Sequence, residues 1–177
     1  YYRIASLISR DVKYMKEMGI NGIIDCQVIR AAFPNGLPMY VLMQTMWDDT
    51  LEFDDIVNDY LSHCYGEDWR QCKKYLSSLA ECFDVEYFQV PTKDFLKPEY
   101  AQKLSRVEEI VSEFEPVVQA NISRYTNKTL ALSWDYMQYH LTYCRLFAKF
   151  MSAKSVGDDV EANIYWTEFF EFVFKNE

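Results

Sequence analysis

A chain of 177 residues is long enough for one sizeable core and short for two full domains. Half of the residues are hydrophobic and 17% are aromatic, a composition that can bury enough apolar area to fold, so intrinsic disorder is not the default interpretation. The formal net charge of −9 suits solubility and argues against nucleic acid and membrane surfaces as partners, and charges interrupt every apolar run before the ~20 residues that a membrane span needs.

The first predicted elements are a helix and a strand. Apolar residues recur at helical spacing over residues 2–18, and Gly19 suits the position just past a helix end. The run over residues 20–28 is rich in β-branched residues and predicts a buried strand. A helix followed by a strand is half of an α/β repeat, so residues 1–38 are interpreted as the remnant of an α/β domain. Because a lone strand lacks hydrogen-bonding partners, either those partners lie upstream of residue 1 or the segment is not a strand in this chain.

Helical patterns fill the rest of the chain. Turn residues occupy positions 29–38, and a short apolar helix is expected over 39–47. Asp49-x-x-Glu52 resembles a helix start. The clearest apolar stripe follows over residues 53–64, and a similar stripe covers 69–83.

The second half begins with an expected linker over residues 84–98. The helix that follows is expected to end or kink at Pro116, with a further turn or two beyond it. A long helix is expected over 127–154, and Gly157 should separate it from a last helix that starts at Asp158. The predicted fold class is therefore mainly α, a helical bundle over 39–177 with a short N-terminal αβ remnant of an α/β barrel.

Few residues point to catalysis. The motifs of phosphate-binding loops, zinc proteases and serine hydrolases are absent, and His63 and His140 lie inside helical stretches, where a structural role fits better. The five cysteines form no C-x-x-C pair and have no metal-ligand spacing to either histidine, so we predict no metal and no cofactor. Unpaired thiols favour a reducing compartment such as the cytoplasm.

An acidic cluster follows the helix expected over 39–47 and extends into the first turn of the helix expected over 53–64. Its members are Asp48, Asp49, Glu52, Asp54 and Asp55. The cluster resembles a catalytic or calcium site, but it lacks the D-x-[DN]-x-[DN]-G loop of calcium sites. A solvated helix start explains it better, which leaves the catalytic residues unassigned.

Asp25 and Gln27 are the candidate substrate-binding residues. Asp25 would lie at the C-terminal end of the predicted strand, which is the edge where α/β barrels gather substrate-handling residues. Gln27 would share its face two positions further on. The alternative is an aspartate that caps the following loop, and the turn propensity of Asp favours that alternative.

Aromatic residues form a second candidate surface, one on which sugars could stack. The set comprises Trp47, Tyr65, Trp69, Trp134, Tyr136, Tyr139 and Trp166. Most of them fall on helix stripes, which favours packing in the core.

Three passages between Asp11 and Leu79 resemble one protein family. Residues 14–22 (YMKEMGING) are similar to its passage of a helix, two glycines and a strand. Residues 42–48 (LMQTMWD) are similar to its L-x-x-x-x-W-[DN] helix, and residues 53–66 (FDDIVNDYLSHCYG) to its D-[LI]-[IV]-x-[DE]-[FY]-[LI]-x-x-x-Y-G helix. The family is domain-of-unknown-function family 4838, mainly bacterial proteins that look related to glycoside-hydrolase barrels.

The resemblance implies that residues 1–28 are the last part of a catalytic barrel and that 39–177 are the helical extension supporting it. It implies hydrolysis or binding of glycans by the complete protein, with most catalytic carboxylates upstream of this chain, which is expected to be inactive alone. Asp25 matches a position where the family has a polar or acidic residue. The alternative is a helical protein-interaction module without catalytic activity. An exposed strand edge would also favour self-association.

Overall fold

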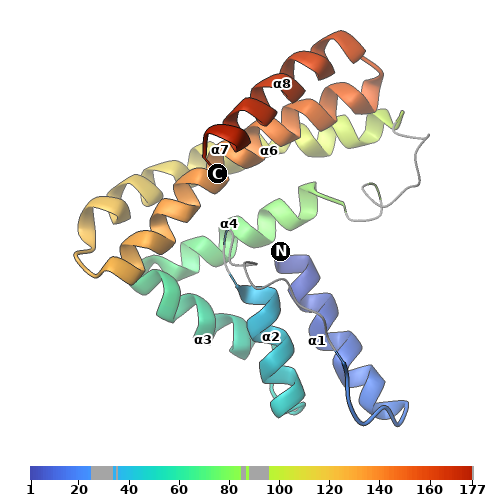
Figure 1. The fold of residues 1–177 in the computed structure, drawn as a ribbon, viewed down its shortest axis with the longest axis vertical. Helices are drawn as coiled ribbons and strands as arrows, with labels where there is room; N and C mark the ends of the chain where they lie inside the picture. The colour runs from blue at the N-terminus through green and yellow to red at the C-terminus, as the bar shows by residue number, and fades with distance from the viewer. Residues whose placement is uncertain (25–33, 35, 85–86, 88–95, 177) are drawn as a thin grey trace.

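Figure 1 shows a computed structural model that describes residues 1–24, 34, 36–84, 87 and 96–176. Within these residues the chain is mainly helical and forms no strand. The helices are α1 (Tyr2–Glu17), α2 (Leu37–Trp47), α3 (Phe53–Tyr65), α4 (Trp69–Cys82), α6 (Pro98–Arg124), α7 (Lys128–Val156) and α8 (Asp159–Lys175). A short 3-10 turn, η1 (Gly66–Asp68), joins α3 to α4. The predicted mainly α class is confirmed.

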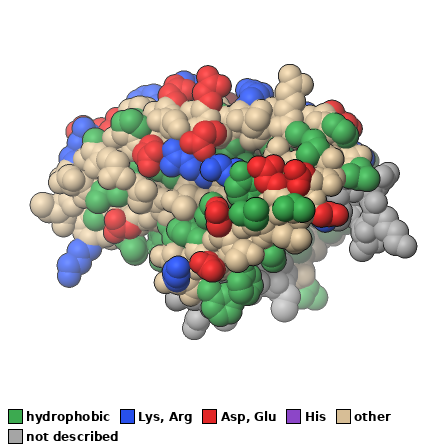
Figure 2. Space-filling model, turned by 90° about the horizontal axis from the view of Figure 1, so that it is seen from above, with side chains coloured by type: hydrophobic (Ala, Val, Ile, Leu, Met, Phe, Trp, Pro, Cys, Tyr) green, Lys and Arg blue, Asp and Glu red, His purple; other side chains and the backbone are tan. Residues whose placement is uncertain are grey.

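Helix α4 lies between two groups of helices. It packs against α1 and α3 of the first group, which α2 completes, and against α6 of the second group. In the second group α7 packs against both α6 and α8, and α3 reaches across to contact α7. Seen from above, the second group shows acidic, basic and hydrophobic side chains intermixed on its surface (Figure 2).

The core forms where the two groups meet. Trp134 of α7 and Tyr65 of α3 are almost completely buried and meet edge to face, with ring centroids 5.3 Å apart. Tyr75 of α4 stacks on Phe114 of α6 at 4.4 Å. The stripes expected over 53–64 and 69–83 supply much of this core, so those predictions are confirmed. The buried members are Ile56, Val57, Leu61, Cys72, Leu76 and Leu79.

The ends of α7 and α8 follow the turn chemistry of the sequence. The side chain of Asn127 accepts a hydrogen bond from the backbone N–H of Thr129 at 2.9 Å, and Asp158 does the same for Glu161 at 2.9 Å. Gly157 between them has a left-handed backbone with φ of 78°. The break expected there is confirmed.

Helix α6 does not end at Pro116, so an end of the helix there is wrong, whereas the further turn or two expected beyond the proline is confirmed. The helix continues for eight residues beyond the proline, to Arg124. Proline removes one helical hydrogen bond and crowds the preceding turn, at a cost of about 3 kcal/mol. Burial of Phe114 and Val118 on either side, against the rest of the core, offsets this cost.

The αβ unit expected at the N-terminus is covered only in part. Residues 20–24 form no strand, Ile24 is fully exposed, and residues 25–28 lie outside the described part of the chain. The boundary drawn between residues 38 and 39 falls within the first turn of α2. The linker expected over 84–98 is described only at its ends and at Tyr87, which is buried and stacks on Tyr100 at 4.1 Å.

Candidate functional site

The C-terminal end of α1 turns the chain towards α2. Gly19 has φ of 79°, and its N–H donates to the carbonyl of Lys16 at 3.0 Å. The N–H of Ile20 donates to the carbonyl of Met15 at 3.0 Å. These two bonds are those of a Schellman ending, which a glycine accommodates without steric cost. The turn brings residues 20–23 opposite the end of α2.

A cavity of ≈ 280 Å³, called the α1–α2 cleft below, lies between these segments. Its lining combines apolar side chains with a few polar ones and a single tryptophan. The lining residues are Val12, Met15, Lys16, Ile20, Asn21, Gly22, Ile23, Thr45, Met46, Trp47 and Asp49. An apolar hollow with a few convergent polar groups is the usual composition of a small-ligand site.

Charged side chains fix one edge of the cleft. Nζ of Lys16 lies 2.5 Å from Oδ2 of Asp49, and this hydrogen bond lowers the pKa of the Asp49 carboxyl. The hydroxyl and the N–H of Thr50 donate to Oδ1 of Asp48 at 2.6 and 2.9 Å, which lowers the pKa of Asp48. Both carboxylates are therefore ionised at neutral pH, and the edge of the cleft presents donors and acceptors together.

At the cleft, α2 presents a buried hydroxyl that lacks a hydrogen-bond partner and an indole ring that is exposed to solvent. Thr45 is buried, and its hydroxyl oxygen has no hydrogen-bond partner among the described residues. A buried hydroxyl without a partner costs about 1–3 kcal/mol, which a ligand group bonded to it would offset. The indole of Trp47 is 90% exposed, so an aromatic face of large area lies open to solvent beside the cleft.

This combination suits a small, hydroxyl-rich ligand. A sugar ring has an apolar face of C–H groups, which packs on an aromatic ring face because that face is electron-rich. Its hydroxyls both donate and accept, and the cleft offers partners for both, because Lys16 donates, the Asp49 carboxylate accepts and the Asn21 amide does both. The cleft is slightly smaller than the ~300–1,000 Å³ usual for drug-sized ligands, which fits one sugar ring better than a long chain.

The residues expected to bind substrate, Asp25 and Gln27, lie outside the described part of the chain.

The carboxylates of the acidic cluster form ion pairs with lysines of two helices, α1 and α4. Besides the Lys16–Asp49 pair, Lys13 of α1 lies 3.8 Å from Glu52, and Lys73 of α4 bonds Asp54 at 2.7 Å. The described residues contain no group of three His, Cys, Asp or Glu side chains that could hold a metal.

The aromatic candidates divide between core and surface. Tyr65 and Trp134 are buried in the core, as the helix stripes predicted. Trp47, Tyr136 and Trp166 are exposed, so the expectation of core packing is wrong for them. Trp47 is the one that lines the cleft. Thr45, Lys16 and Asn21 were not recognised in the sequence, because nothing local shows that the ends of α1 and α2 meet.

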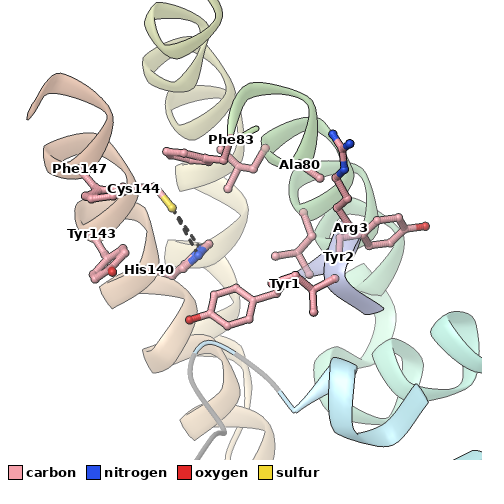
Figure 3. Close-up of a pocket in the computed structure, with 12 residues that line it drawn as sticks. Tyr1, Tyr2, Arg3, Ala80, Phe83, His140, Tyr143, Cys144 and Phe147 are labelled. Atoms are coloured by element: carbon pink, nitrogen blue, oxygen red, sulfur yellow. Dashed lines mark hydrogen bonds between the residues drawn. The ribbon is translucent and has the colours of Figure 1, made fainter. Parts of the chain in front are cut away.

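A buried histidine and cysteine form a second polar cluster (Figure 3). His140 and Cys144 of α7 border a cavity of ≈ 230 Å³ between α4, α7 and the start of α1. Sγ of Cys144 lies 3.4 Å from Nε2 of His140, and the hydroxyl of Tyr75 lies 3.0 Å from Nδ1. The structural role expected for His140 fits this hydrogen-bonded position.

The pair lacks the charges that nucleophilic catalysis needs. Burial lowers the pKa of His140 to about 3 and raises the pKa of the Cys144 thiol to about 12. Both groups are therefore neutral at neutral pH, whereas a catalytic cysteine requires a thiolate. The four cysteines in the described ranges are free thiols, and three of them (Cys72, Cys82 and Cys144) are buried as small hydrophobic side chains.

Comparison with known proteins gives no relative from which to transfer a role. No protein-family model, no curated protein and no solved structure matches the chain. In the described ranges, no helix combines the length and hydrophobicity required to cross a membrane.

Proposed function

We propose that this chain is the helical region of a carbohydrate-active protein of glycoside-hydrolase type, and that the α1–α2 cleft contacts the glycan. Residues 1–38 would then be the end of a catalytic barrel and residues 39–177 the extension that supports it. Within the protein that contains the barrel, the cleft would bind a sugar ring beside the catalytic centre.

One observation carries this proposal. Two of the three passages that resemble family 4838, residues 14–22 and 42–48, are separate in the sequence and supply opposite walls of the same cleft. The first passage contributes the Schellman turn with Lys16 and Asn21, and the second contributes Thr45 and Trp47. Motif residues that meet around an aromatic ring and several polar groups favour ligand binding over a purely structural role.

Asp25 and Gln27 extend the proposal. They follow Ile23, which lines the cleft, by two and four positions in the chain. If Asp25 takes part in proton transfer in the protein that includes the barrel, Asp25→Asn should lower turnover about 100-fold or more. Unchanged kinetics in that variant would remove Asp25 from the mechanism.

Glycan binding by the cleft can be tested on this chain directly. A glycan array identifies soluble oligosaccharides, which are then titrated into the ¹⁵N-labelled chain while the indole N–H resonance of Trp47 is followed. We expect a saturable shift of that resonance and loss of binding in Trp47→Ala. Because Trp47 is 90% exposed, its removal should leave the unfolding midpoint nearly unchanged.

The matched control is Trp166→Ala, which removes a partly exposed tryptophan from α8. That variant should bind glycans as the parent chain does. An array without a hit, or Trp47→Ala binding as tightly as the parent, would overturn the proposal.

A second candidate is the protein-interaction module without catalytic activity. The observation that favours it is the set of exposed apolar side chains on α8: Val160, Ile164, Phe170 and Phe174. Contiguous exposed apolar side chains of this kind mark interaction surfaces. Self-association of the chain, which this candidate allows, would show as a concentration-dependent mass in light scattering.

A further inference from the structure

Helix α8 is apolar on two opposite sides. One side packs on α7, where Phe169 lies against Tyr143 and Phe172 stacks on Tyr139 at 4.6 Å. The opposite side faces solvent and carries Val160, which is 75% exposed, and Phe174, which is 62% exposed. A helix that is apolar on both sides normally packs on both sides, so the outer side of α8 lacks a contact that its sequence favours.

The outer side has the spacing of a helix–helix seam. Val160, Ile164, Thr167, Glu171 and Phe174 follow one another at intervals of four, three, four and three residues. This 3–4 alternation places all five on one stripe, which is the arrangement by which a helix packs along another helix. The stripe is apolar at its two ends and polar in its middle. We call these five residues the outer seam.

A hollow of ≈ 420 Å³ lies at the middle of the outer seam. It is lined by Asn163, Ile164, Thr167, Glu168 and Glu171. Ile164 offers an apolar surface, and the two glutamates provide negative charge beside it. A lysine or arginine side chain matches both features, because its stem is apolar and its head is cationic.

Charge decides which occupant fits. Helix α8 with its N-cap carries five carboxylates (Asp158, Asp159, Glu161, Glu168, Glu171) against one lysine, Lys175. A second copy aligned in parallel would bring Glu171 against Glu171, and an antiparallel copy centred on Thr167 would bring Glu171 against Ile164 and Asn163. Glu171 lies 3.6 Å from Lys175, so in either arrangement one lysine per helix serves five carboxylates. Two copies would therefore bring together two helices that each carry an excess of four negative charges, which disfavours the contact. Anionic lipid surfaces are disfavoured by the same charges.

We propose that the outer seam of α8 docks an amphipathic helix of a partner protein. That helix places a basic residue in the hollow, between Glu168 and Glu171, and apolar residues one to two turns away on either side, against Val160 and Phe174. Figure 2 views the molecule from above and shows hydrophobic side chains next to acidic ones on the face turned to the viewer. The seam and the α1–α2 cleft share no residues, so this inference is independent of glycan binding.

The test uses synthetic helical peptides of about three heptads with leucine along one stripe. The first peptide has arginine at the central seam position, the second has glutamate there, and the third has the composition of the first with its stripe scrambled. We expect the parent chain to bind the first peptide saturably with one site, as measured by calorimetry. Glu171→Lys should weaken that binding at least about tenfold and improve binding of the glutamate peptide.

Asp11→Lys serves as the control, because it makes the same charge change on an exposed position of α1, away from α8 (Figure 1). It should bind the arginine peptide as the parent does. Equal affinity for the scrambled peptide, or an unchanged affinity in Glu171→Lys, would overturn the proposal. Sedimentation that shows a dimer dissociated by Ile164→Glu would assign the seam to a second copy instead.

Discussion

Arg145 of α7 donates to Glu115 of α6 at 2.8 Å, one residue before the proline inside α6. The same guanidinium bonds Glu108 at 3.0 Å and the hydroxyl of Ser112 at 3.2 Å. These three acceptors span two turns of α6 that lead up to Pro116. The guanidinium therefore links the turns next to the missing hydrogen bond to α7, which helps the helix continue through the proline.

Arg145→Met should lower the free energy of unfolding by about 1–2 kcal/mol, because two carboxylates lose a cation that is mostly shielded from solvent. Methionine keeps the apolar stem of the side chain, so the change removes mainly the charged contacts. Urea unfolding measures the difference. Arg106→Met is the control: Arg106 makes an exposed contact of 3.6 Å with Glu81, and its loss should cost less than about 0.5 kcal/mol.

The pH dependence of this difference follows from Glu115. The hydrogen bond from Arg145 lowers the pKa of Glu115 below its ordinary value of 4.5. The stabilisation that the Arg145–Glu115 contact gives the folded chain is therefore complete above pH 4.5, and it is lost as the pH falls through the lowered pKa of Glu115. The difference in free energy of unfolding between the parent and Arg145→Met should become smaller on acidification below pH 4.5. A gap that stays constant to pH 3 would contradict the assignment.

The helices were predictable from the sequence because their signals are local. Apolar spacing located α3 and α4, and Gly157 with Asp158 located the junction of α7 and α8. Trp47 and Trp134 show what these local signals do not predict. Trp47 and Trp134 both lie on apolar helix stripes, yet one is exposed and the other is buried against Tyr65. Which stripe another helix covers depends on contacts between distant segments, and one sequence does not reveal those contacts.

The candidate site was hidden for the same reason. Tyr14 to Gly22 and Leu42 to Asp48 were recognised as motifs, but only the fold makes them opposite walls of the α1–α2 cleft. The hydrogen bond between Tyr75 and His140, 65 positions apart, was equally unpredictable. A helix end at Pro116 is what the local rule for proline allows, and that rule omits the tertiary contacts through which α6 continues to Arg124.

Gly66→Ala should destabilise the protein strongly. Gly66 has φ of 63° and ψ of −136°, a conformation that side chains other than glycine rarely adopt. A Cβ there would lie 2.3 Å from the hydroxyl oxygen of Tyr125, which accepts the N–H of Glu67 at 3.2 Å. Strain and clash together should lower the free energy of unfolding by about 2–4 kcal/mol in thermal or urea unfolding.

Gly22→Ala is the matched control for that substitution. A Cβ at Gly22 meets no atom within 4 Å, and its φ is not in the left-handed region. Its effect should stay within about 0.5 kcal/mol. Equal stability of the two alanine variants would show that the turn at Gly66 relaxes without cost.

His140→Gln should change how stability depends on pH. Burial holds the pKa of His140 at about 3 in the folded chain, against an ordinary value of 6.5. Between these values the unfolded chain binds more protons, so stability rises with pH there. The contribution of the neutral His140 to the free energy of unfolding is complete above pH 6.5 and is lost progressively as the pH falls towards 3. For the parent chain, a decrease of one pH unit well below pH 6.5 should therefore lower the free energy of unfolding by up to about 1.4 kcal/mol through His140 alone.

The window from pH 5 to 6.5 isolates this effect, because ordinary carboxylates are still ionised there. Urea unfolding across that window should give His140→Gln a shallower slope of stability against pH than the parent has, whatever its absolute stability. If His140→Gln keeps the slope of the parent, His140 is protonated in the folded chain and the neutral cluster with Tyr75 and Cys144 is wrong.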